Sequence, residues 1–164
     1  MQIDAKALKE KWCGWEFDAV DFEISAEPMV EFAVSCGETQ SRFIDPGDAD
    51  FQAVPSYTTR FHGRRAMPAD FPIKQHEGFD AGKSVEVHNT LRPGDKLTAR
   101  SEIHDIYEKT GRSGAMLFIV HRMKFSNQRG ELISIVDWRL VKRQADRVGR
   151  SDGGSARSSE RGDE

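Results

Sequence analysis

Long hydrophobic runs and cysteines are both scarce in this sequence. No apolar stretch approaches the roughly 18 residues that a membrane-spanning helix needs, so we expect no membrane span. The two cysteines, Cys13 and Cys36, lie far apart and in no spacing typical of a zinc site or a redox pair. The amino terminus also lacks the apolar run of a secretory signal. We therefore expect reduced thiols, a cytoplasmic location, no metal and no cofactor.

Excess positive charge is absent too. The chain has 24 Lys and Arg residues against 27 Asp and Glu residues, which gives a net charge of -3. Since a protein that binds nucleic acid usually carries a basic surface, we expect no nucleic-acid partner. Glycine-rich phosphate loops, the Gly-x-Ser-x-Gly nucleophile elbow and internal repeats are also missing. Hydrophobic residues nevertheless make up 37% of the 164 residues, enough for one globular domain with a real core.

The first quarter of the chain predicts a helix, a strand and a second helix. Residues 5–12 have an amphipathic pattern, and residues 16–24 alternate like a strand with one apolar side. Ser25 is a plausible N-cap, and residues 29–36 carry apolar side chains at the three-and-four spacing of a helix. Gly37 is typical of the residue that ends a helix.

The middle of the chain, residues 39–80, has no clear periodicity. It contains four prolines together with several glycines and polar clusters. A structureless loop of this length is unusual inside a domain. We therefore expect the region to contain a helix within residues 56–65, and a segment that overhangs a substrate site.

Four strand-like runs follow, at residues 84–91, 96–108, 115–126 and 131–143. Apolar side chains alternate along them, and short turns with glycine join them as antiparallel neighbours. A sheet with one apolar face needs a covering layer. The predicted fold class is therefore α+β, with a curved antiparallel sheet around a central helix, in a domain of residues 1–143. Residues 144–164 are rich in Ser, Gly, Arg and Asp and predict a disordered polar tail.

The most informative motif lies at residues 32–43, FAVSCGETQSRF. It resembles the signature Gly-Asp-x-Asn-Pro-x-His of the hot-dog-fold (R)-specific enoyl hydratases and MaoC-like dehydratases. The glycine is kept, but Glu38 stands at the aspartate position and Phe43 at the histidine position. Gln40 and Ser41 replace the Asn-Pro pair. The usual catalytic dyad is therefore broken in this chain.

Later segments extend the resemblance. Residues 91–97, 105–112, 116–118 and 126–132 fit, in order and spacing, the amino-terminal dehydratase-like domain of the same family. Together the segments cover roughly residues 10–143. The resemblance implies a hot-dog fold, in which a curved sheet wraps around a central helix.

The family also implies a chemistry. A carboxylate and a histidine five residues apart share a water, and backbone N–H groups at the start of the central helix hold the thioester oxygen. Glu38 is accordingly the candidate catalytic residue. Phe43 transfers no proton, so an imidazole would have to come from elsewhere, and His62 and His88 are the candidates. His121 interrupts the apolar face of a strand and is interpreted as a core or interface residue.

Substrate contacts are predicted in the same regions, at Gln40, Phe43, Ser56, Tyr57, His62 and Arg64. The hydroxyl groups of residues 56–59 suit a pocket, but they equally suit a turn or the start of a helix. Arg64 belongs to a cluster with Arg60 and Arg65. This cluster suits either the phosphates of coenzyme A or a carrier protein, or a solvated helix face.

The leading hypothesis is a hydro-lyase component of fatty acid metabolism. The chain would be the motif-poor subunit of an enoyl-thioester hydratase or (3R)-hydroxyacyl-thioester dehydratase, and it would shape the acyl-binding tunnel. The expected substrate is an acyl-CoA or acyl-carrier-protein thioester. The expected partner is a motif-bearing hot-dog subunit, or otherwise a second copy, because open sheet edges are normally paired. Three alternatives stay open: a homodimeric hot-dog acyl-CoA thioesterase, a self-sufficient hydratase that uses Glu38, and a non-catalytic acyl-thioester binding module.

Overall fold

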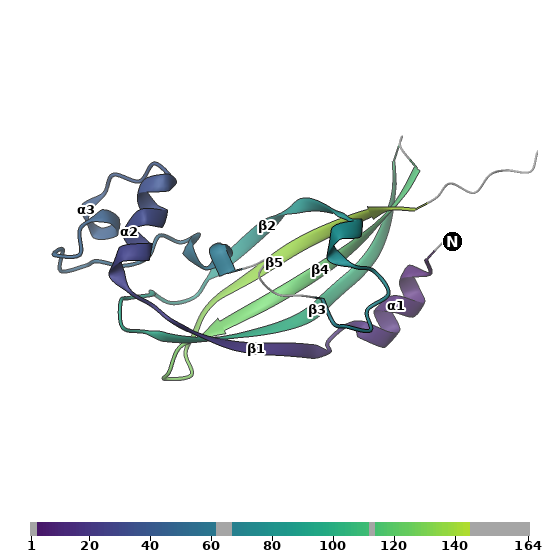
Figure 1. The fold of residues 1–164 in the computed structure, drawn as a ribbon, viewed down its shortest axis with the longest axis horizontal. Helices are drawn as coiled ribbons and strands as arrows, with labels where there is room; N and C mark the ends of the chain where they lie inside the picture. Colours follow the sequence, from purple (N-terminus) through teal and green to yellow (C-terminus); the bar gives the residue numbers. More distant parts are fainter. Residues whose placement is uncertain (1–2, 62–66, 112–113, 145–164) are drawn as a thin grey trace, which may run out of the picture.

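The computed structural model describes residues 3–61, 67–111 and 114–144, which form one five-stranded antiparallel sheet with short helices (Figure 1). The strands lie in the order β1-β3-β4-β5-β2. In chain order the elements are α1 (Ala5–Trp12), β1 (Glu16–Glu23), α2 (Ala26–Ser35), α3 (Ser41–Ile44), the 3-10 helices η1 (Tyr57–Phe61) and η2 (Gln75–Glu77), β2 (Phe79–Val87), β3 (Lys96–Gly111), β4 (Gly114–Ser126) and β5 (Leu132–Arg143). No helix among the described residues is long and apolar enough to cross a membrane.

The long central strands bury one face of the sheet. β3, β4 and β5 have 16, 13 and 12 residues. Every second side chain along β4 is buried, namely Leu117, Ile119, His121, Met123 and Phe125. Because side chains of a strand point alternately to its two faces, these residues share one face, which we call the inner face.

All four strand pairs of the sheet contain a shift of register, and two of these shifts concern β3 and β2. The register of β3 with β4 shifts between Ile103 and Asp105, and the register of β2 with β5 shifts between Asp80 and Lys83. A bulge of this kind bends a strand and increases its twist. Gly82 lies inside the second irregularity at a φ of 93°, which a residue with a side chain rarely adopts.

One end of the inner face is covered by α2, α3 and η1 (Figure 1). Met29 and Ala33 of α2, Phe43 of α3, and Tyr57 and Phe61 of η1 belong to one buried cluster. The sheet contributes Leu97, Ala99, Met123, Phe125 and Val136 to it. The aromatic rings of η1 therefore connect the helices with the sheet.

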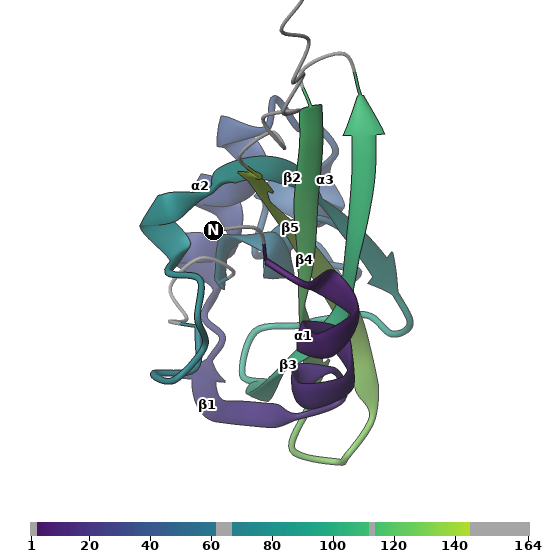
Figure 2. The ribbon, with the colours of Figure 1, turned by 90° about the vertical axis from the view of Figure 1, so that its right-hand side faces the viewer.

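The opposite end is covered by α1 and by residues 67–77. Viewed along the molecule, α1 lies close to the sheet (Figure 2). Trp12 of α1 packs edge-on against Phe71, with ring centroids 5.4 Å apart. A salt bridge from Lys142 of β5 to Glu77 fastens η2 to the sheet. The sheet side of this second cluster consists of Ile103, Ile106, Leu117, Ile119, Trp138 and Leu140.

The predicted α+β class and the curved antiparallel sheet are confirmed. The first two helices, β1 and the last three strands also lie within three residues of their predicted bounds. The prediction for β2 was less accurate, because this strand runs from Phe79 to Val87 rather than over residues 84–91. Its first six residues are all exposed, so no alternation of apolar side chains marks where it begins.

The helix predicted within residues 56–65 is much shorter in the described part of the chain. Only the five residues of η1 are helical there, and residues 62–66 lie outside the described residues. The Thr59 hydroxyl donates to the Ser56 carbonyl at 2.7 Å, a local bond that competes with helix propagation. β-branched Thr58 and Thr59 also have low helix propensity. The inner face is therefore covered by several short elements.

Gln144 connects the two ends of the described chain. We assigned this residue to the polar tail, but it is buried. Its side chain accepts a hydrogen bond from the Ile3 N–H at 2.8 Å and donates to the Glu108 carboxylate at 2.6 Å. The ordered domain therefore extends at least to Gln144, and residues 145–164 lie outside the described residues.

We predict that Ile103→Ala lowers the free energy of unfolding by about 2–5 kcal/mol, because it leaves a cavity at a fully buried position of the inner face. Val34→Ala shortens a side chain of α2 that is 58% exposed, and it should change the free energy of unfolding by no more than about 0.5 kcal/mol. Urea unfolding followed by circular dichroism measures both. Equal effects of the two substitutions would contradict the assignment of the inner face.

Candidate functional site

The motif region begins where α2 ends. Gly37, at a φ of 78°, follows the C-cap residue Cys36. Its N–H donates to Val34 O at 2.9 Å, and the N–H of Glu38 donates to Ala33 O at 3.0 Å. This pair of bonds is the Schellman arrangement that closes many helices. Gly37 is therefore required here by backbone geometry, as the sequence predicted.

Glu38 binds its own chain. Its Oε1 accepts hydrogen bonds from the backbone N–H groups of Thr39, at 2.9 Å, and Gln40, at 3.1 Å. The bond from Gln40 and, to a smaller extent, the bond from Thr39 hold the pKa of the Glu38 carboxyl below its ordinary value. A lowered pKa makes the carboxylate a weaker base. Glu38 thus stabilises the turn after α2, and its role as a catalytic base stays a prediction.

Phe43 and Gln40 lie in different surroundings. Phe43 is 6% exposed and belongs to the cluster beneath α2, with the Arg42 guanidinium 4.6 Å from its ring centroid. Gln40 is exposed and borders a shallow polar hollow with Ser41 and Asp48. The structure places a packing residue where the family signature has its histidine.

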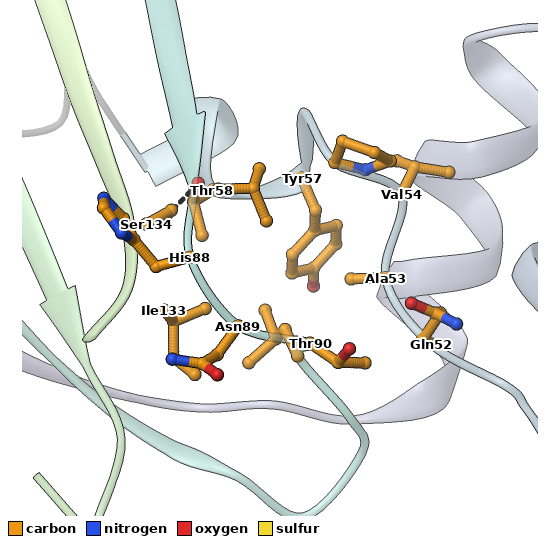
Figure 3. Close-up of a pocket in the computed structure, with 13 residues that line it drawn as sticks. Gln52, Ala53, Val54, Tyr57, Thr58, His88, Asn89, Thr90, Ile133 and Ser134 are labelled. Atoms are coloured by element: carbon orange, nitrogen blue, oxygen red, sulfur yellow. Dashed lines mark hydrogen bonds between the residues drawn. The ribbon is translucent and has the colours of Figure 1, made fainter. Parts of the chain in front are cut away.

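A separate pocket of about 260 Å³ lies between η1 and the end of β2 (Figure 3). Its lining consists of residues 52–55, 57, 58, 87–91, 133 and 134. Of the predicted substrate contacts, only Tyr57 lines it. Ser56 is not part of the lining, and His62 and Arg64 lie outside the described residues. The structure therefore does not bring the predicted contacts together in one place.

Tyr57 is a deeply buried residue of the pocket lining. It is 2% exposed, and its hydroxyl oxygen accepts a hydrogen bond from Nη1 of Arg60 at 2.8 Å. Arg60 also donates to Pro28 O at 3.3 Å, which ties η1 to α2. On the other side, the hydroxyl of Ser134 in β5 donates to that of Thr58 at 2.8 Å. η1 is thus fastened both to a helix and to the sheet.

His88 lies at the edge of the pocket, directly after β2. Its Nε2 is 3.2 Å from Oε1 of Glu86, whose side chain is 69% exposed. His121 is fully buried on the inner face, where its ring packs against Phe17 with centroids 5.2 Å apart. Within residues 3–61, 67–111 and 114–144, no three His, Cys, Asp or Glu side chains gather as a metal site would require.

The sequence pointed to Tyr57, Thr58 and His88, but it did not point to the other polar residues of the pocket. Gln52, Asn89 and Thr90 lie in connecting segments without periodicity, and uncharged side chains form no recognisable motif. The prolines and the Arg92-Pro93-Gly94 turn nearby were the only signal that these segments fold closely together.

The profile of the family described as "FAS1-like, dehydratase domain region" matches residues 11–136, most of the chain. The chain belongs to this family. No curated protein that was compared matches it. The resemblance to MaoC-like dehydratases that the sequence suggested is confirmed by this match.

Solved structures agree with the family in their fold. The FAS1-like domain is similar to a MaoC-like dehydratase from Rhodospirillum rubrum, at 21% identity and a TM-score of 0.57, over 81% of this chain and 94% of that one. It is also similar to the HadBC (3R-hydroxyacyl-ACP dehydratase) complex from Mycobacterium tuberculosis, at 23% identity and a TM-score of 0.56, over 77% of this chain and 93% of that one. The ChsH1-ChsH2 complex of the same organism is similar at 15% identity and a TM-score of 0.62, over 84% of this chain and 88% of that one. The hot-dog fold is thereby confirmed.

We predict that the Glu38 carboxyl titrates below the ordinary pH range of a glutamate, because two backbone N–H groups favour its charged form. The stabilising contribution of these bonds is complete above the ordinary pKa and is lost as the pH falls through the lowered pKa. Carboxyl-detected NMR, assigned with Glu38→Gln, measures the midpoint. A midpoint at or above the ordinary value would show that these bonds are absent in solution.

We predict that Phe43→His lowers the free energy of unfolding by about 2 kcal/mol or more, since a polar ring replaces an apolar one in a buried cluster. Thr39→His, at an exposed position just before the same short helix, is the control and should have little effect. Thermal unfolding compares the two. If Phe43→His is as stable as the wild type, Phe43 is not the packing residue described above.

Proposed function

We propose that this chain is the motif-poor subunit of an enoyl-thioester hydratase or (3R)-hydroxyacyl-thioester dehydratase. The observation that carries the proposal is the state of the signature residues. Phe43 is buried where the family has a histidine, and the Glu38 carboxylate is bound to its own backbone. The family and the hot-dog fold support the reaction class. The substrate is a thioester of coenzyme A or of a carrier protein.

The reaction itself explains why a partner is needed. Dehydration of a 3-hydroxyacyl thioester requires a base for the C2 proton and an acid for the leaving hydroxyl group. Phenylalanine at position 43 serves neither purpose. In the proposed enzyme the partner subunit supplies the carboxylate and the imidazole, and this chain supplies part of the tunnel wall.

Two of the similar structures support a complex of unlike chains. HadBC and ChsH1-ChsH2 are each described as a complex, and HadBC is named a (3R)-hydroxyacyl-ACP dehydratase. We extend this arrangement to the present chain as part of the proposal. A cytoplasmic location and a role in fatty acid metabolism remain predictions with it.

β2 is the edge at which we place the partner. The N–H of His88 donates to Ile133 of β5 at 2.8 Å. Pairing is regular from Lys83 to Val87, and N–H groups point alternately to the two sides of an antiparallel strand. The N–H of Lys83 therefore points away from β5, toward the open edge. An added strand would find hydrogen-bonding groups there.

The opposite edge is chemically different. β1 carries Glu16, Asp18, Asp21 and Glu23 within its eight residues and contains no lysine or arginine. Glu16 and Glu23 form salt bridges with Arg100 and Lys96 of the neighbouring β3. Charged side chains on an edge strand oppose the addition of another strand. β2 carries charges of both signs, at Asp80, Lys83 and Glu86, and it leads directly into the pocket at residues 87–91. The purely acidic composition of β1 therefore favours β2 as the paired edge.

The decisive experiment measures crotonyl-CoA hydration. The purified chain is assayed alone and after coexpression with a Gly-Asp-x-Asn-Pro-x-His chain encoded beside it. We expect turnover only in the mixture, and loss of this turnover when the histidine of the partner is replaced. Robust turnover by the chain alone that Glu38→Ala abolishes would establish the self-sufficient hydratase and refute the proposal. Thioester hydrolysis without hydration would favour the thioesterase.

We predict that Lys83→Pro prevents association through β2, because proline removes the N–H that points to the open edge. Lys83→Ala removes the same charge but keeps the N–H, and it should associate like the wild type. Sedimentation velocity of the coexpressed complex separates the two results. Association of both variants to the same extent would place the interface elsewhere.

A further inference from the structure

The hydroxyl group of Tyr57 is buried and faces the pocket. In Figure 3 it points into the space between Ala53 and Thr90. Its oxygen accepts from Arg60, but no bond donated by this hydroxyl is found within the described part of the chain. A buried donor without an acceptor is unfavourable. The hydroxyl is therefore suited to donate to an acceptor that enters the pocket.

Arg60 strengthens this donor. A hydroxyl that accepts a hydrogen bond from a cation becomes polarised and donates more strongly itself. The guanidinium is held by Tyr57 and by Pro28 O and does not belong to the pocket lining. Arg60 thus acts through Tyr57 and does not offer a direct positive charge to a ligand.

The rest of the lining is uncharged apart from the titratable His88 at the rim. It contains no Lys, Arg, Asp or Glu. Gln52 donates through its side-chain nitrogen to Asp50 O at 3.2 Å. That bond orients the amide so that its oxygen faces the space beside the Tyr57 hydroxyl (Figure 3). The pocket therefore offers a donor and an acceptor in neutral surroundings, which favours an uncharged amide over a phosphate or a free carboxylate.

We propose that this pocket binds an amide unit of the pantetheine arm of the thioester, an inference that rests on the proposed function. Tyr57 donates to the amide carbonyl, and Gln52 accepts from the amide N–H. A volume of about 260 Å³ accommodates part of the arm and excludes the whole coenzyme. The same arm occurs in coenzyme A and in carrier proteins, so the pocket recognises what the two carriers share.

Titration calorimetry with free pantetheine tests the site on the full chain. We expect Tyr57→Phe to weaken binding about tenfold, the size typical of one hydrogen bond to an uncharged group. Tyr107→Phe is the matched control, since it removes the other tyrosine hydroxyl of the chain from β3. It should bind like the wild type. Gln52→Leu, which keeps the side-chain size, should weaken binding as Tyr57→Phe does, and butyrate should not compete.

The outcomes separate this site from the proposed function. The inference fails if the wild-type chain does not bind pantetheine. It also fails if Tyr57→Phe folds and binds pantetheine as tightly as the wild type. Both results would count against the pocket even if the mixture with the partner hydrates crotonyl-CoA. Tyr57-dependent binding together with an inactive mixture would support the pocket and refute the hydratase subunit. Should Tyr57→Phe unfold, the Gln52→Leu measurement decides.

Discussion

Burial of the inner face of the sheet is the constraint on which the remaining structure depends. β3, β4 and β5 bury mostly apolar side chains at alternate positions in their central parts. Each square ångström of this surface removed from water contributes roughly 25 cal/mol. Since the described helices are short, several segments from residues 5–77 must lie across the face. This requirement brings η1 against β5, and it thereby places Tyr57 beside the end of β2.

The altered signature is consistent with the same constraint. A buried histidine needs hydrogen-bond partners for its ring nitrogens, whereas phenylalanine needs only apolar contacts. Phe43 obtains these contacts in the cluster beneath α2. With the imidazole gone, the nearby carboxylate of Glu38 is free to close the turn after the helix. In the proposed enzyme, the segment that performs chemistry in the family serves as a structural connection.

Sequence reasoning predicted the features that repeat and missed those that arise from contacts. The alternation along β4 and β5 and the Gly37 helix end were sufficient for the sheet and for the motif region. Exposed β2 offered no periodicity at its start, and local hydroxyl bonds shortened the helix expected from Ser56 onward. The pocket could not be predicted, because Gln52 and Asn89 are far apart in the sequence and meet only when the sheet is covered. Gln144 gave no signal either, since its partners Ile3 and Glu108 are distant.

The carboxylates of β1 have a consequence for assembly size. A sheet with two receptive borders can add subunits at both and grow into a ribbon, as fibrils do. In the proposed pairing through β2, the four acidic residues of β1 disfavour the addition of a further strand at the other edge. The proposed assembly then stops at two subunits, and its sheet does not extend into a polymer.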